Sequence, residues 1–83
     1  MRCLVADRSA TTRRILRNVL RDLGAAEVLE AAGADEALEA IDGGVDVVVA
    51  GISVPGLEGL DLVRRLRERP ESSAVPVMVI AAR

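Results

Sequence analysis

Short apolar runs alternate with segments of helical periodicity along this chain. Four runs predict strands, at residues 3–6, 27–31, 45–50 and 75–82. The segments between them predict helices, at residues 10–23, 34–42 and 58–69. The third run is nearly all valine, which is typical of a strand buried on both faces of a parallel sheet. The order βαβαβαβ therefore predicts one α/β domain over residues 1–83, a parallel sheet with helices on both faces.

The first predicted helix carries signals at both ends. Ser9 stands where an N-cap side chain is needed, and Gly24 stands where a left-handed residue commonly ends a helix. The apolar residues between them are spaced to share one face, which we expect to pack on the sheet: Ile15, Leu16, Val19, Leu20 and Leu23.

The composition excludes several classes of function. The chain has no aromatic residue, no lysine and a net charge of −2, so it lacks the stacking rings and the basic face of nucleic-acid-binding domains. Its single cysteine, Cys3, provides neither a disulfide nor a metal cluster, and we expect a buried, inert thiol. No apolar stretch is long enough to span a membrane. We therefore expect a cytoplasmic protein with no nucleic-acid or membrane partner.

Three motifs occur together in a familiar order. Residues 4–17 are an apolar strand, Asp7-Arg8 and a helix that opens Ser-x-x-x-Arg. Residues 47–62 hold a strand that ends at Gly51, with Pro55 four residues later and an acidic residue–Gly pair at 58–59. Residues 75–82 form a strand that ends in Ala-Ala. Together they resemble a bacterial response-regulator receiver domain of the chemotaxis type.

The resemblance implies a flavodoxin-like, doubly wound parallel sheet with strand order 2-1-3-4, which right-handed crossovers also favour. It covers the whole chain but only about two thirds of a receiver, and it implies that the last helix–strand–helix is lacking. The function implied is that of a receiver module in two-component, phosphorelay signal transduction.

The phosphorylation site implied by the resemblance is largely absent. The phosphoacceptor position is Gly51, which has no carboxylate to attack a phosphohistidine. Of the two acidic positions after the first strand, Asp7 is kept and the second is Arg8. The hydroxyl position is Ala81, and the chain contains no lysine. We therefore expect a pseudo-receiver that is not an enzyme, has no catalytic residue and has lost Mg²⁺, with Asp7 at most a weak ligand.

Weaker candidates favour structural roles. The hydroxyls of Ser9 and Ser53 are expected to cap helices or face solvent, and Glu58 and Asp61 to complement a helix dipole. A cluster of basic residues, Arg64, Arg65, Arg67 and Arg69, alternates with acidic ones and is expected to form a solvated helix face. One further hypothesis places the Arg8 guanidinium beside Asp7, in the space of the missing metal ion.

The last strand predicts an interface. A helix is about 10 Å wide and strands lie about 4.8 Å apart, so one helix covers roughly two strands. The third and fourth strands should therefore be bare on the side of the first helix. Val77, Met78, Val79 and Ile80 would then bind a protein partner or a second copy. Two alternatives stay open: a non-signalling structural fragment of a longer protein, and a small anion-binding domain, which would lack a glycine-rich phosphate loop.

Overall fold

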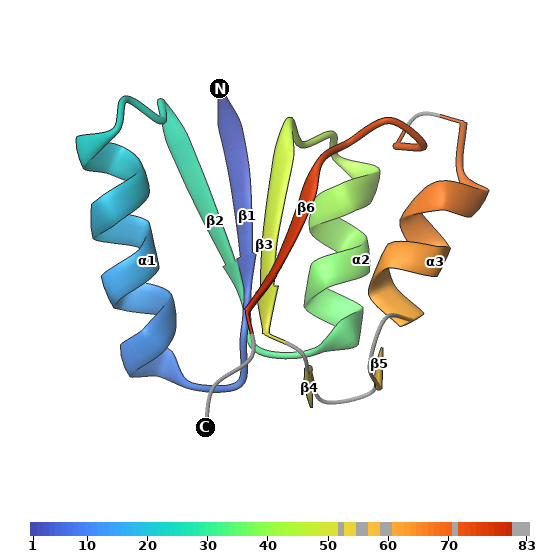
Figure 1. The fold of residues 1–83 in the computed structure, drawn as a ribbon, viewed down its shortest axis with the longest axis horizontal. Helices are drawn as coiled ribbons and strands as arrows, with labels where there is room; N and C mark the ends of the chain where they lie inside the picture. Colours follow the sequence, from blue (N-terminus) through green and yellow to red (C-terminus); the bar gives the residue numbers. More distant parts are fainter. Residues whose placement is uncertain (52, 55–56, 59–60, 71, 81–83) are drawn as a thin grey trace.

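A computed structural model of the chain describes residues 1–51, 53–54, 57–58, 61–70 and 72–80 (Figure 1). The elements of the first half are β1 (Arg2–Ala6), α1 (Ala10–Asp22), β2 (Glu27–Ala31), α2 (Ala34–Asp42) and β3 (Val47–Gly51). They are followed by β4 (Ser53–Val54), β5 (Leu57–Glu58), α3 (Asp61–Glu68) and β6 (Val77–Ile80).

Four strands form one parallel sheet in the order β2-β1-β3-β6. Helix α1 lies on one face of this sheet, and α2 and α3 lie on the other (Figure 1). The predicted α/β fold and its strand order 2-1-3-4 are therefore confirmed. Helix α1 also has the predicted ends: the Ser9 Oγ accepts a hydrogen bond from the Thr12 N–H, and Gly24 has a φ of 104°.

The segment after β3 differs from the prediction. A helix was expected from Glu58, but β4 and β5 form a small antiparallel pair with Val54 opposite Leu57. Residue 58 belongs to this pair, so its backbone cannot start a helix, and α3 begins at Asp61. The side chains of Ser53, Glu58 and Asp61 lie outside the described residues, and their predicted roles stay predictions.

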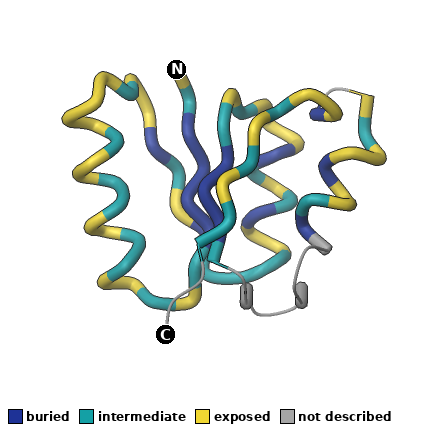
Figure 2. The backbone as a smooth tube through the Cα atoms, in the orientation of Figure 1, coloured by how far each residue is buried: buried dark blue, intermediate teal, exposed yellow. Residues whose placement is uncertain are grey.

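The core has one cluster on each face of the sheet, and the central strands are its most buried part (Figure 2). The cluster under α2 and α3 is the larger: Leu4, Ala6, Ala31, Ala37, Ile41, Val48, Ala50, Leu62 and Leu66. The cluster on the α1 face is smaller: Cys3, Val5 and Val28 are buried, with Leu16 and Leu20 packed against them. The sheet is therefore covered unevenly.

The prediction that all five apolar residues of the first helix pack on the sheet is wrong. None of its residues is buried, and Ile15, Val19 and Leu23 are 57%, 47% and 79% exposed. Leu16 and Leu20 face β1 and β2. Arg13 and Arg17 pair with Glu30 of β2. Because successive residues turn by about 100°, Ile15 and Val19 lie on the opposite flank of the helix, on the side of β3 and β6. Nothing in the described part of the chain covers that flank.

Candidate functional site

The first candidate site lies at the carboxyl ends of β1 and β3, where Asp7 and Gly51 follow Ala6 and Ala50. These two alanines are paired in register, so the sheet brings Asp7 and Gly51 together, as the motifs predict. Helix α1 starts just beyond this edge, and its cap residue Ser9 completes the loop.

Three hydrogen bonds hold Asp7 in place. Its backbone N–H donates to the Ala31 carbonyl at 3.0 Å, and its backbone carbonyl accepts from Arg13 Nη1 at 2.7 Å. The carboxylate Oδ1 accepts from the Ser9 backbone N–H at 2.8 Å. This last bond is the local satisfaction expected of a loop carboxylate at the start of a helix.

The second carboxylate oxygen of Asp7 points at Gly51. A Cβ placed on Gly51 would overlap Asp7 Oδ2 and would lie 3.2 Å from Asp7 Cγ. The space for a side chain at the acceptor position is therefore occupied by the carboxylate of Asp7. Residue-type patterns do not reveal this contact, because it depends on the direction of one side chain.

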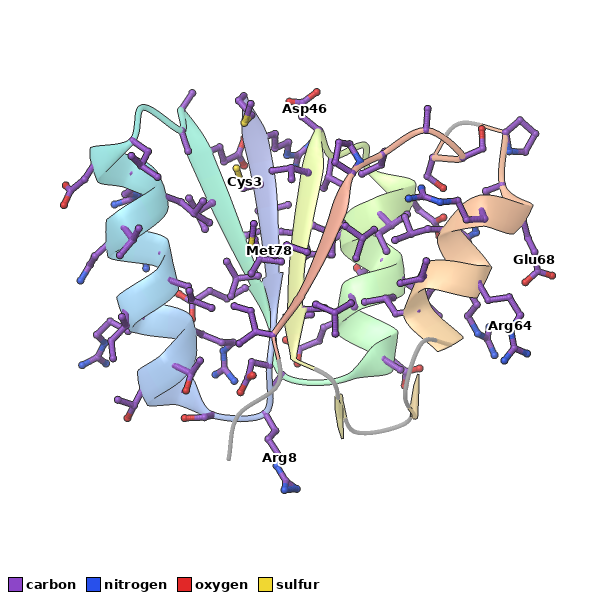
Figure 3. The ribbon with its side chains drawn as sticks, viewed as in Figure 1. Cys3, Arg8, Asp46, Arg64, Glu68 and Met78 are labelled. Carbon is purple, nitrogen blue, oxygen red and sulfur yellow. The ribbon has the colours of Figure 1, made fainter. Side chains whose placement is uncertain are left out.

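Arg8 does not lie where the hypothesis placed it. The residue is exposed and its side chain projects away from the sheet (Figure 3). The hypothesis that its guanidinium occupies the metal position is wrong. Neighbouring residues of an extended segment point in opposite directions, and here the carboxylate of residue 7 turns inward while residue 8 turns to solvent.

The basic cluster of α3 also differs from a purely solvated face. Arg67 Nη1 donates to the carbonyl oxygens of Ser73 at 3.1 Å and Val75 at 2.7 Å, and makes a longer bond of 3.5 Å to that of Ser72. The chain turns back after Pro70, which brings these carbonyls beside the last turn of the helix. The guanidinium therefore organises the connection to β6.

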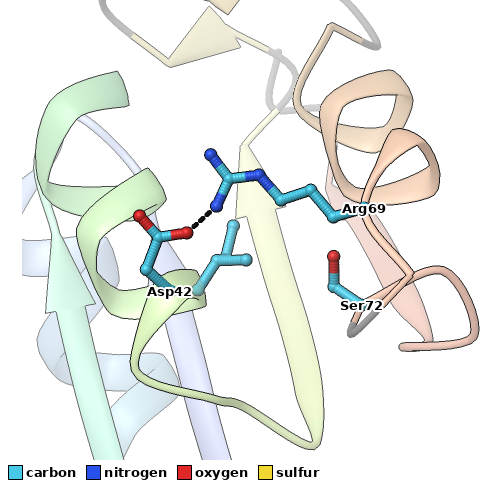
Figure 4. Close-up of a pocket in the computed structure, with 4 residues that line it drawn as sticks. Asp42, Arg69 and Ser72 are labelled. Atoms are coloured by element: carbon cyan, nitrogen blue, oxygen red, sulfur yellow. Dashed lines mark ion pairs between the residues drawn. The ribbon is translucent and has the colours of Figure 1, made fainter.

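A cavity of about 380 Å³ lies between the ends of α2 and α3 (Figure 4). It is lined by Ile41, Asp42, Arg69 and Ser72. Arg69 forms an ion pair with Asp42, and the Ser72 hydroxyl donates to the Leu66 carbonyl at 2.8 Å. The polar groups that line it thus have partners within the chain.

The second candidate site is the interface predicted at residues 77–80. In register, Met78 pairs with Val49, and Val49 with Val5, which belongs to the α1 cluster. Met78 therefore faces the α1 side and is 62% exposed, whereas Val77 packs into the α2/α3 cluster. The four predicted residues thus divide between two faces, with Met78 and Ile80 on one and Val77 and Val79 on the other.

We call the apolar surface on the α1 side the open face: Ile15 and Val19 of α1 with Met78 and Ile80 of β6. It is smaller than predicted, because Val49 is only 5% exposed and Val47 packs against the α1 cluster.

No helix in the described part of the chain is long and apolar enough to cross a membrane.

Comparison with known proteins decides the family. Residues 3–83 match the family model of the response regulator receiver domain. The chain belongs to the response-regulator receiver family.

Chemotaxis proteins are among the relatives of this receiver domain. CheY1 of Helicobacter pylori is 39% identical over 82 residues, which are 96% of this chain and 66% of that protein. CheY-3 of Vibrio cholerae is also 39% identical, over 99% of this chain and 64% of that protein. The high-resolution structure of the chemotaxis response regulator CheY4 of Vibrio cholerae is similar, with a TM-score of 0.87 at 26% identity; the match covers 94% of this chain and 65% of that one. The receiver domain thus spans about two thirds of the length of these relatives.

The receiver family implies a divalent metal ion beside the acceptor, and the residues present do not fit one. Mg²⁺ needs several oxygen ligands. Asp7 supplies one carboxylate, of which one oxygen accepts from Ser9 and the other is packed against Gly51. Among the residues that the structure describes, no three His, Cys, Asp or Glu side chains are grouped to hold a metal ion. Ala81, at the hydroxyl position, lies outside the described residues.

Proposed function

We propose that this receiver domain is a pseudo-receiver, a cytoplasmic, non-enzymatic signalling module that acts by protein contact and not by phosphoryl transfer. The observation that carries the proposal is at Gly51. The acceptor position has no side chain, and its space holds the carboxylate of Asp7. An acyl phosphate therefore has neither a nucleophile nor room to form at this position.

The electrostatics of the site support the same proposal. Phosphoryl transfer needs cations that neutralise the charge spread over the phosphoryl oxygens. The chain has no lysine, Arg8 points into solvent, and Arg13 is engaged with Glu30 and with the Asp7 carbonyl. Loss of Mg²⁺ binding is part of the proposal, since Asp7 is the one carboxylate left in the loop after β1.

Incubation with acetyl phosphate and Mg²⁺, followed by intact-mass spectrometry, tests the proposal. We expect no phosphoryl adduct on the wild-type chain, with a receiver domain that carries aspartate at the acceptor position as positive control. The Gly51→Asp variant alone should also stay unlabelled, because the lysine and the second loop carboxylate are still missing. A hydroxylamine-labile adduct on the wild type would overturn the proposal. Labelling of the variant alone would show that the rest of the site is more complete than we propose.

The proposed contact surface is the open face together with the edge of β6. Exposed apolar side chains gathered on one face are typical of protein interfaces. Strand β6 has no charged residue in Val77–Ile80, so its unpaired backbone groups are available to another strand. We propose that a partner protein or a second copy of the chain covers this surface, and that nucleic acid and membranes do not.

A second candidate is a structural part of a longer receiver protein without a signalling role of its own. The observation that favours it is the coverage of about two thirds of CheY1 and CheY-3. In that case the open face would be covered by chain from the same protein. Light scattering separates the candidates: a partner-binding module forms a defined complex, whereas a fragment aggregates without fixed stoichiometry.

A further inference from the structure

The contact between Asp7 and Gly51 has a consequence for the fold that is independent of phosphorylation. We infer that the Asp7 carboxylate acts as the side chain of position 51, filling its space and pinning the β1–α1 loop to the end of β3. A side chain at position 51 would then have to displace this carboxylate, so the two positions are sterically coupled.

The backbone gives no other reason for glycine at this position. Among the described glycines, only Gly24 and Gly44 have a positive φ. Gly51 is therefore in a conformation that any residue can adopt, and it is the last residue of a regular strand paired with Ile80. What a side chain at position 51 would meet is the Oδ2 of Asp7, which a Cβ would overlap unless the carboxylate turned away.

Asp7 can withdraw from Gly51 only by turning its side chain, which breaks a hydrogen bond. Its backbone is held on both sides, by the Ala31 carbonyl and by Arg13 Nη1, so only rotation of the side chain could relieve the overlap. That rotation would remove Oδ1 from the Ser9 N–H at 2.8 Å. Ser9 in turn caps α1 through the Thr12 N–H at 3.2 Å. The carboxylate thus links the end of β3 to the first turn of α1.

A double-mutant cycle in the full chain tests the inference. Gly51→Ala should lower the melting temperature in the wild-type background, on the order of 5 °C. In an Asp7→Ala background the same substitution should have no effect or raise it, since alanine reduces the entropy of the unfolded chain. In an Asp7→Asn background, which keeps the shape of the side chain, Gly51→Ala should lower the melting temperature again. All variants are compared at one protein concentration.

Gly43→Ala is the matched control. Gly43 has a φ of −76°, and its nearest neighbour would lie 3.5 Å from an added Cβ, an ordinary contact. This control should not lower the melting temperature. Amide hydrogen exchange of Ser9 gives a second readout, because Gly51→Ala should release its hydrogen bond and speed its exchange.

The inference would be overturned if Gly51→Ala lowered the melting temperature equally in the wild-type and Asp7→Ala backgrounds. Protection of the Ser9 amide that survives Gly51→Ala unchanged would also overturn it. If Gly51→Ala alone does not fold, the inference requires that adding Asp7→Ala restores folding, and failure of that rescue counts against it.

Discussion

The two flanks of helix α1 meet the same sheet in opposite ways. On the β2 flank, Glu30 forms ion pairs with Arg13 and Arg17, both at 3.3 Å. On the β6 flank, Ile15 and Val19 are exposed, and no charged side chain occurs in β6. One edge strand carries charges and the other carries none.

The difference indicates which edge of the sheet is available to a partner. Charged side chains on an edge strand disfavour pairing with another strand, because pairing would desolvate them. Strand β2 has Glu27 and Glu30 on its five residues, and Arg2 pairs with Glu27 at 3.4 Å. The β2 flank of α1 is therefore paired with charged residues of the sheet. We expect association at the other flank, where apolar side chains are exposed.

The largest effect is expected from Val79→Lys, which tests the assignment of faces on β6. Val79 pairs in register with Ala50, a member of the α2/α3 cluster, so its side chain points to the covered side. An ammonium there loses apolar burial and is partly desolvated, at a cost of roughly 3 kcal/mol. We expect the melting temperature to fall by about 10 °C or more, measured by circular dichroism. A melt close to that of the wild type would mean that β6 has the opposite orientation.

Met78→Lys is the reciprocal change and should affect association more than stability. Met78 is 62% exposed on the open face, so the free energy of unfolding of the variant should lie within about 0.5 kcal/mol of the wild-type value. Light scattering should show the wild type above the monomer mass and the variant shifted toward monomer. Asn18→Lys, which adds the same charge at an exposed position of α1, is the control and should leave the mass unchanged. A monodisperse wild-type monomer whose melt is independent of concentration would refute the association.

Glu30→Ala sharpens the other half of the comparison. It removes both ion pairs of the β2 flank. Because their side chains are partly exposed, we expect the free energy of unfolding to fall by only about 0.5–1 kcal/mol. Salt should shrink the difference in melting temperature, since screening weakens the pairs in the wild type. Glu27→Ala, whose pair with Arg2 is more exposed, should cost less. If the difference in melting temperature does not depend on salt, Glu30 stabilises the fold by packing and not by its ion pairs.

The smallest effect concerns Cys3, beneath the covered part of α1. Burial raises the pKa of the Cys3 thiol, with a smaller opposing effect of the N-terminal amino group. The folded state then keeps its proton to higher pH than the unfolded chain, whose thiol ionises near about 8.5. This contribution to stability is complete below that pH and is lost as the pH rises through the folded pKa. Melts between neutral pH and about pH 10 should show the loss, and Cys3→Ala should remove that part of the dependence. An identical pH profile for the two proteins would contradict it.

Sequence periodicity was sufficient for the order of the sheet and for the first two helices, and insufficient where side-chain direction decides. Glu27–Ala31 and Ala34–Asp42 form their elements as predicted, because each has a clear pattern and a stop signal. In Val77–Ile80 every residue is apolar, so alternation is silent, and only the register with β3 shows which residues face α1. An apolar stripe on α1 likewise does not reveal whether another element covers it.

The candidate site follows the same rule. The positions of Asp7 and Gly51 at one edge were predictable from the strand order. The direction of the Asp7 carboxylate was not, since it depends on a rotamer that a local hydrogen bond sets. The Arg67 contacts were also missed, because composition shows a charge and not the carbonyls that surround it.

Arg67 also bears on the order in which the sheet assembles. Pairing β6 with β3 requires the chain to close a loop through α3, and such closure is an entropic cost that slows folding. By gathering the Ser73 and Val75 carbonyls beside α3, the guanidinium can order this connection before β6 reaches the sheet. We expect the β6 edge to be the last part of the sheet to form. A refolding rate that Arg67→Met leaves unchanged would mean instead that the connection becomes ordered only after β6 has paired.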